Sequence, residues 1–220
     1  MKKHTFRLFD LTSLKARNMK YASIAASLVI VFGSTRYASA QGTTIYVKSG
    51  SSLQLDGTST LHNFTCTTQD VEGSVIVDGS QLSGGVSDAK NFIVGANIVI
   101  PVKNLKSESD GLNDNMDNAL KMKDNPNITY TFGNSESALA ESGNSSKFDI
   151  KTMGTLTIGG AQKQIEMIVT LSKTDDGKIT MHGREDVNMT DFGIDPPSFM
   201  FGALKAGNKV VISFDLMLAQ

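Results

Sequence analysis

The sequence predicts an all-β fold, an antiparallel barrel of about eight strands with one short helix. Apolar and polar residues alternate with a period of two in one segment after another beyond residue 40, which is the pattern of half-buried strands. Glycine-containing turn pairs separate these segments. Closing such strands into a barrel removes exposed sheet edges, and a two-sheet sandwich is the alternative architecture.

The first 40 residues predict an export signal. Seven of the 21 basic residues lie there, opposed only by Asp10. An uncharged, mostly apolar run at 21–33 follows most of them, and the Ala-Ser-Ala triplet at 38–40 matches a cleavage site. The run is shorter than the roughly 20 residues of a transmembrane helix. We therefore expect residues 1–40 to be a signal peptide, with Met19 as an alternative start.

Residues 41–220 are expected to form one periplasmic or secreted domain. Without the seven basic residues and the one acidic residue of the signal, 14 basic and 21 acidic residues remain, a net charge of −7. This balance argues against nucleic acid as a partner, because phosphate binding needs clustered Lys and Arg. Cys66 is the single cysteine, so no intrachain disulfide can form and the core must stabilise the fold. We expect Cys66 to be a small buried hydrophobe.

Nine segments have the alternation of strands. In chain order they are 45–55, 58–67, 71–77, 97–102, 127–132, 147–151, 164–171, 178–189 and 210–218. The predicted turns between them are Asp56-Gly57, Asp78-Gly79, Gly84-Gly85, Gly159-Gly160 and Asp176-Gly177. The last of these lies between two alternating runs and predicts a hairpin.

The segment 112–123 instead predicts a helix. Its apolar side chains recur at helical spacing on one face, at Leu112, Met116, Ala119 and Leu120. Asp110 or Asn113 is the expected cap, and Asn125-Pro126 is the expected end.

Few residues suggest catalysis or metal binding. Beyond the signal the histidines are His62 and His182, and neither belongs to a zinc-site spacing. The sequence also lacks the nucleophile-elbow, P-loop and dinucleotide-binding motifs. The acidic run at 108–117 is typical of a solvated helix start. The sequence therefore predicts no enzyme, no metal and no cofactor, with a hydrolase using His62 or His182 as a less favoured alternative.

The segment 191–205 is the most distinctive loop. Its large apolar side chains are too numerous to stay solvated, and its glycines and prolines oppose a regular strand. We expect it to pack at one barrel opening, beside the helix or across from it. It would act there as a plug, or as the lining or gate of an apolar cavity.

An outer-membrane barrel would show the same alternation with its apolar face outward. Such barrels carry aromatic girdles, whereas this chain has no Trp, and only Tyr46 and Tyr130 remain after the signal. The composition therefore favours a barrel with an apolar interior.

Six further segments are informative in their order along the chain: 57–64 (GTSTLHNF), 102–105 (VKNL), 125–132 (NPNITYTF), 154–160 (GTLTIGG), 191–194 (DFGI) and 196–202 (PPSFMFG). Together they resemble the YceI-like, polyisoprenoid-binding family of exported bacterial proteins over about residues 46–218. The resemblance implies a lipocalin-like barrel whose tunnel holds a long apolar chain, such as an isoprenoid, an isoprenoid quinone or a fatty-acid derivative. It implies no catalytic residues and no cofactor.

Strand phase supplies the candidate ligand contacts. The side chains expected to point into the barrel are Phe64, Phe132, Ile150, Met167, Met181 and Phe214, and the loop adds Phe199 and Phe201. His62 and Tyr130 are the expected polar anchors for a head group.

The predicted function is that of a periplasmic protein that binds an apolar small molecule. No transmembrane segment is expected after cleavage, and a homodimer is left open. The main alternative is a stress-related interaction protein with a filled barrel, and an empty interior volume would separate the two.

Overall fold

The computed structural model describes residues 42–84, 91–140, 147–174, 178–199 and 204–220. The predicted signal and cleavage site lie outside these residues. The first strands are β1 (Gly42–Val47), β2 (Ser52–Ser59), β3 (Phe64–Thr68), β4 (Glu72–Asp78), β5 (Ile93–Pro101) and β6 (Asn127–Ala140). They are followed by β7 (Lys147–Ile158), β8 (Ala161–Lys173), β9 (Ile179–Asn188), β10 (Ser198–Phe199) and β11 (Leu204–Ala219). The helices are α1 (Gly79–Gly84) and α2 (Asp110–Ala119), with 3-10 turns η2 (Val102–Asn104) and η3 (Met189–Phe192).

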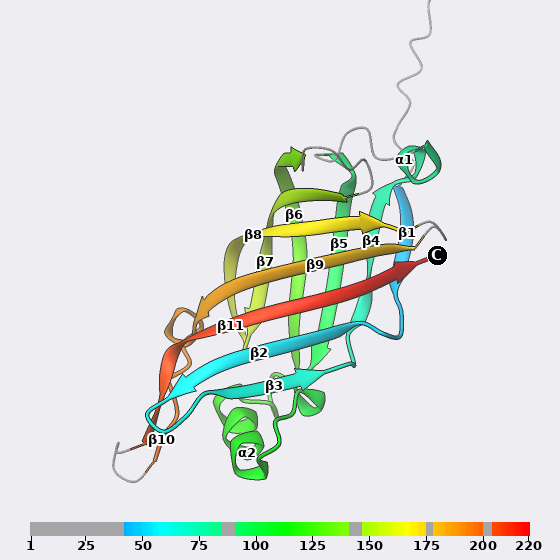
Figure 1. Cartoon of the computed structure of the whole chain (residues 1–220). Coiled ribbons are helices and arrows are strands. Elements are labelled where there is room, and N and C mark those ends of the chain that lie inside the picture. Colours follow the sequence, from blue (N-terminus) through cyan, green and yellow to red (C-terminus); the bar gives the residue numbers. More distant parts are fainter. Residues whose placement is uncertain (1–41, 85–90, 141–146, 175–177, 200–203) are drawn as a thin grey trace, which may run out of the picture. The chain divides into compact units, whose positions relative to one another are not determined.

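The strands close into an eight-stranded antiparallel barrel, which confirms the predicted fold class (Figure 1). Its strand order is β1-β4-β5-β6-β7-β8-β9-β11. The ring closes where β1 pairs with β11, through Tyr46 opposite Ala219 and Val47 opposite Leu218. Strand β2 follows β1 along the same edge of β11, and β3 pairs with β2. Helix α2 lies at the β3 end of this arrangement in Figure 1.

The first predicted strand and its turn were wrong. The segment 45–55 is divided between β1 and β2 by a turn in which Gly50 has a φ of 94°. Asp56-Gly57 is not a turn, because β2 continues through it to Ser59 and pairs with β3. Across that ladder the Thr65 hydroxyl donates to Asp56 Oδ1 at 2.6 Å, which lowers the pKa of Asp56. The Phe64 ring occupies the space above Gly57 that a β-carbon would need.

The glycine pair between β7 and β8 is a turn, as predicted. Gly159 and Gly160 have φ values of 57° and 84°, which side-chain-bearing residues rarely adopt. Asp176-Gly177 lies outside the described residues, and the strands on either side of it, β8 and β9, pair in an antiparallel ladder. After Asp78 the chain enters the short helix α1, which the sequence did not predict.

Helix α2 starts earlier and ends earlier than predicted. Its cap is Ser109 and neither Asp110 nor Asn113, because the Ser109 hydroxyl accepts a hydrogen bond from the Leu112 backbone N–H at 3.4 Å. The helix ends at Ala119, and Lys121 follows with a φ of 52°. The predicted end at Asn125-Pro126 was therefore several residues too late.

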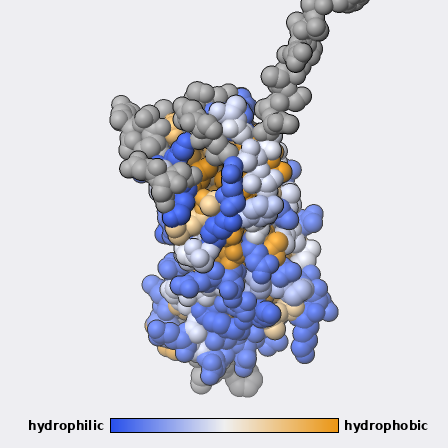
Figure 2. Space-filling model, turned by 90° about the vertical axis from the view of Figure 1, so that its right-hand side faces the viewer, coloured by the Kyte–Doolittle hydropathy of each residue, from blue (hydrophilic) through white to orange (hydrophobic). Residues whose placement is uncertain are grey.

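The core of the barrel is built from the inward phase of every long strand. Along β7, for example, buried and partly exposed residues alternate from Ile150 to Ile158. The outer surface is largely hydrophilic in the lower part of Figure 2, and hydrophobic colour gathers in its upper part. Among the described residues, no helix has the length and apolar character needed to cross a membrane.

Candidate ligand-binding site

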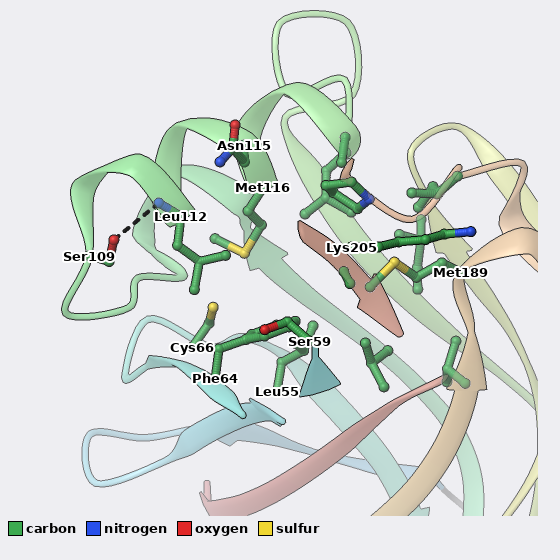
Figure 3. A pocket seen from close by; sticks show the side chains of 18 of the residues that line it. Leu55, Ser59, Phe64, Cys66, Ser109, Leu112, Asn115, Met116, Met189 and Lys205 are labelled. Atoms are coloured by element: carbon green, nitrogen blue, oxygen red, sulfur yellow. Dashed lines mark hydrogen bonds between the residues drawn. The ribbon is translucent and has the colours of Figure 1, made fainter. Parts of the chain in front are cut away.

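A cavity of about 410 Å³ lies between α2 and the strands β2, β3 and β11. We call it the helix-side cavity, and its size is within the range of small-molecule pockets. Figure 3 shows Leu112 and Met116 pointing from the helix toward Cys66 and Phe64. Leu112 and Met116 make the helix wall of the cavity apolar, and Phe64 and Cys66 of β3 make the opposite wall apolar as well.

The apolar face of α2 explains this arrangement. Its four predicted face residues, Leu112, Met116, Ala119 and Leu120, all line the helix-side cavity. None of the residues within α2 is fully buried, although this face packs against the core. An amphipathic helix normally buries such a stripe against its neighbours. Here the stripe packs in part against the core and also borders the helix-side cavity.

The loop after β9 packs at the same end of the barrel, as the sequence predicted. Phe192, Ile194 and Pro197 line the helix-side cavity together with α2. Phe192 and Ile194 are buried, which accounts for part of the apolar content of the loop. The backbone of Phe199 pairs with Leu204 in the β10–β11 ladder. The side chain of Phe199 and the whole of Phe201 lie outside the described part of the chain.

Polar and charged residues line the helix-side cavity at the β2–β3 turn, at Lys205 and on the α2 side, where Ser109 and Asn115 lie. Leu61, 70% exposed, and the exposed His62 form the turn. The Ser59 hydroxyl holds this turn by donating to the His62 carbonyl at 2.7 Å. The Lys205 backbone N–H donates to Thr60 Oγ1 at 3.2 Å and ties the turn to β11. Lys205 is the one Lys, Arg, Asp or Glu residue among the described residues that line this cavity.

A second cavity of about 110 Å³ lies deeper in the barrel. We call it the inner cavity. It shares three lining residues, Leu55, Ile128 and Ile212, with the helix-side cavity, so the two adjoin. All but three of its described lining residues are apolar. The interior thus holds two adjoining apolar cavities, one beside α2 and one deeper in the barrel.

Tyr130 is one of the three polar residues of the inner cavity. Its ring lies over Gly154, whose missing side chain makes room for it. Its hydroxyl is buried and has no hydrogen-bond partner among the described residues. Burial raises the pKa of Tyr130, with a smaller opposing effect of the nearby Thr152 hydroxyl. The Thr152 hydroxyl itself donates to the Met167 carbonyl at 3.2 Å.

Glu185 is the third polar residue, and the sequence analysis missed it. It shares the inward phase of β9 with the buried Met181 and Val187, and it lines the inner cavity. Burial raises the pKa of its carboxyl group, and the neighbouring Asp186 and Glu166 add to the effect. A signal was present in the sequence, because an acidic residue in the apolar phase of a strand is unusual.

The raised pKa of Glu185 predicts a pH-dependent effect of Glu185→Gln. The charged carboxylate is disfavoured in the folded state. The stabilising contribution of the protonated carboxyl group is therefore full below the unfolded pKa of about 4.3, and it is lost as the pH rises through the higher folded pKa. We expect the glutamine variant to be more stable than the parent at neutral pH, with no gain at about pH 4. Denaturant midpoints across this range test the prediction. A constant difference at every pH would contradict it.

The predicted inward-facing residues are all buried or partly buried. Phe132, Met167, Met181 and Phe214 line the inner cavity, and Phe64 lines the helix-side cavity. Ile150 is 0% exposed but lines neither cavity, so it is a packed core residue in this structure. The two predicted polar anchors are not brought together, because His62 lies at the β2–β3 turn and Tyr130 lies in the inner cavity. Contact of any of these residues with a ligand remains a prediction.

The two histidines have different surroundings. His182 Nδ1 lies 2.8 Å from Asp215 Oδ1, and both side chains are more than half exposed. The neighbours of His182 on β9, Met181 and Gly183, are buried, so His182 has the outward phase. His62 Nδ1 lies 3.1 Å from the Asn63 carbonyl. Cys66 is buried beside the cavity, and burial raises the pKa of its thiol, which opposes a nucleophilic role.

The sequence profile of the YceI-like domain matches residues 44–218. The chain belongs to the YceI-like domain family. The match spans the barrel from β1 to the end of β11, with α2 and the loop after β9 included. The sequence has no significant match among curated proteins.

Solved structures share the fold of this YceI-like chain at low identity. BcnA of Burkholderia cenocepacia is similar with a TM-score of 0.60 and 17% identity, over 79% of this chain and 99% of that one. A polyisoprenoid-binding domain from Saccharophagus degradans, implicated in plant cell wall breakdown, has a TM-score of 0.58 and 13% identity, over 81% and 98%. A YceI protein of Campylobacter jejuni has a TM-score of 0.51 and 14% identity, over 100% and 99%. At these identities the likeness concerns the fold alone.

Proposed function

We propose that this YceI-like barrel binds a long apolar molecule and shields it from water. The ligand is an isoprenoid, an isoprenoid quinone or a fatty-acid-like chain. One observation carries the proposal: the helix-side cavity and the inner cavity adjoin each other, and both are lined mainly by apolar side chains. An elongated chain fits such a space better than a compact polar metabolite does.

The energetics of burial support a chain-like ligand. Each methylene removed from water contributes about 0.8 kcal/mol, so about ten carbons contribute several kcal/mol before ordering costs are subtracted. No covalent step is needed for this activity. The name of the Saccharophagus degradans protein, a polyisoprenoid-binding domain, is consistent with the same ligand class.

The two alternative functions have less support. A filled barrel would leave no interior volume, whereas the helix-side cavity measures about 410 Å³. A hydrolase would need one histidine with a second convergent polar group beside the bound chain. Among the described residues, His182 pairs with Asp215 at positions of outward phase, and His62 contacts a backbone carbonyl. We therefore propose binding without catalysis.

Native mass spectrometry of the protein purified from its own host tests the proposal. We expect a species heavier than the polypeptide by the mass of a lipid, and we expect organic extraction to remove that added mass. Refolded, extracted protein should regain it when offered a cell-membrane lipid extract. A bare polypeptide mass before extraction and after reloading would contradict the proposal.

We further propose that the protein acts in the periplasm or outside the cell, after cleavage following Ala40. The basic, apolar and small-residue order of the first 40 residues supports this. N-terminal sequencing of the exported protein is expected to begin at Gln41. A start beyond Tyr46 would contradict the prediction, because β1 pairs through Tyr46 with Ala219 when the barrel closes.

A further inference from the structure

The three polar side chains of the inner cavity come from β6, β7 and β9, with β8 between the last two strands. Thr152 of β7 is opposite Met167 of β8 in the ladder. The β8–β9 ladder ends at Val169 opposite Gly183, and Glu185 follows Gly183 by two residues on the same inward face of β9. The Tyr130 hydroxyl lies over Gly154, two residues along β7 from Thr152. The three groups therefore form a polar belt in an otherwise apolar space.

The hydrogen-bonding capacity of this belt is incomplete. The Tyr130 hydroxyl is buried without a partner, which costs free energy that a native structure normally recovers through a ligand or a water. Thr152 uses its hydrogen to bind the Met167 carbonyl but keeps acceptor capacity. No described residue donates a hydrogen bond to the Glu185 carboxyl group. The belt thus offers an unused donor at Tyr130 and unused acceptors at Glu185.

The charge of the belt restricts the groups that it can accept. None of the described residues lining the inner cavity is Lys, Arg or His, so Glu185 has no cation there. A carboxylate or phosphate there would face the partly buried Glu185 carboxylate, and the two like charges would repel each other. A carbonyl can accept from Tyr130 but has nothing to donate to Glu185. A hydroxyl can accept from the one and donate to the other.

We propose that Tyr130, Thr152 and Glu185 form a subsite for an uncharged hydroxyl group, so that the preferred ligand is a long-chain alcohol whose hydroxyl end lies deep in the barrel. This inference rests on the proposed function and narrows its ligand class. The apolar chain would extend from the belt through the junction at Leu55, Ile128 and Ile212 toward α2. Long-chain carboxylates would be excluded from this orientation.

Two saturated ligands of equal chain length test the subsite. One is a fatty alcohol and the other is a fatty acid, and each is titrated at neutral pH. The parent protein is expected to bind the alcohol at least about tenfold more tightly than the carboxylate. Tyr130→Phe removes only the hydroxyl group and is expected to weaken alcohol binding about fivefold. Glu185→Gln removes the charge and is expected to strengthen carboxylate binding about tenfold.

Glu72→Gln is the matched control for charge. It removes a carboxylate from an exposed position of β4 that lines neither cavity, and it is expected to change neither affinity more than about twofold. Circular dichroism of each variant checks that it is folded. Two variants are used because either one alone would settle the proposal if the other failed to fold.

The outcomes separate the subsite from the general function. Preference for the alcohol, reduced by Tyr130→Phe and by Glu185→Gln, supports the subsite. Equal binding of both ligands by the parent, with both variants unchanged, overturns the subsite and leaves apolar binding in place. Failure of the parent to bind either ligand overturns the proposed function as well.

Discussion

Ala119→Trp is expected to weaken the binding of a long apolar ligand by about tenfold to a hundredfold. Ala119 lies on the α2 face that lines the helix-side cavity. An indole ring there would occupy volume that several methylene groups of the ligand need, at about 0.8 kcal/mol each. The ring would enter the volume of the helix-side cavity, so it should fit with less strain than in a packed core. Titration of a fluorescent long-chain ligand measures the effect.

Asn118→Trp provides the control for Ala119→Trp. Asn118 is the neighbouring residue on the same helix, but it is exposed and does not line the helix-side cavity. We expect this variant to keep the affinity of the parent protein. Equal affinities for both tryptophan variants would mean that the helix-side cavity is not the binding site.

Phe92→Ala is expected to lower the free energy of unfolding by about 3–5 kcal/mol, as for other buried aromatic side chains. Phe92 is 1% exposed and belongs to the core, and its carbonyl accepts the Asp78 backbone N–H at 2.8 Å. It lines neither the helix-side nor the inner cavity, so the ligand affinity of the folded variant should be unchanged. Denaturant unfolding and the same ligand titration separate the two effects.

Val94→Ala serves as the control for the Phe92 prediction. Val94 lies two residues further along the chain and is 49% exposed. Its truncation is expected to change stability by no more than about 0.5 kcal/mol. A loss below about 1 kcal/mol for Phe92→Ala would show that the β4–β5 end of the barrel tolerates a cavity and contributes little to the core.

The strands were predictable because most have a buried and an exposed face, which gives the sequence a period of two. The break between β1 and β2 left no such signal, since it depends on the φ of Gly50. The Asp56-Gly57 error has another cause. This pair is typical of turns, but in the structure Gly57 makes room for the Phe64 ring across a ladder. Local propensity cannot reveal a partner that tertiary pairing supplies.

The candidate site was predictable in its parts. The helical spacing of Leu112, Met116 and Ala119 predicted the face that lines the helix-side cavity. Strand phase also placed Met167 and Ile150 inside, but only Met167 lines a cavity. Whether an inward side chain borders empty space depends on how all eight strands pack, and that is not encoded in the phase of any one strand. Glu185, in contrast, was visible as an acidic residue in an apolar phase.

A chain-length series of linear alcohols, titrated calorimetrically against the parent protein and Ala119→Trp, tests apolar binding in the barrel most directly. For the parent we expect the affinity to rise about fourfold per added methylene and to level off once the chain outgrows the cavities. For the tryptophan variant the plateau should come at a shorter chain. An affinity that does not change with chain length, or a series that is identical for the two proteins, would contradict binding in the barrel interior.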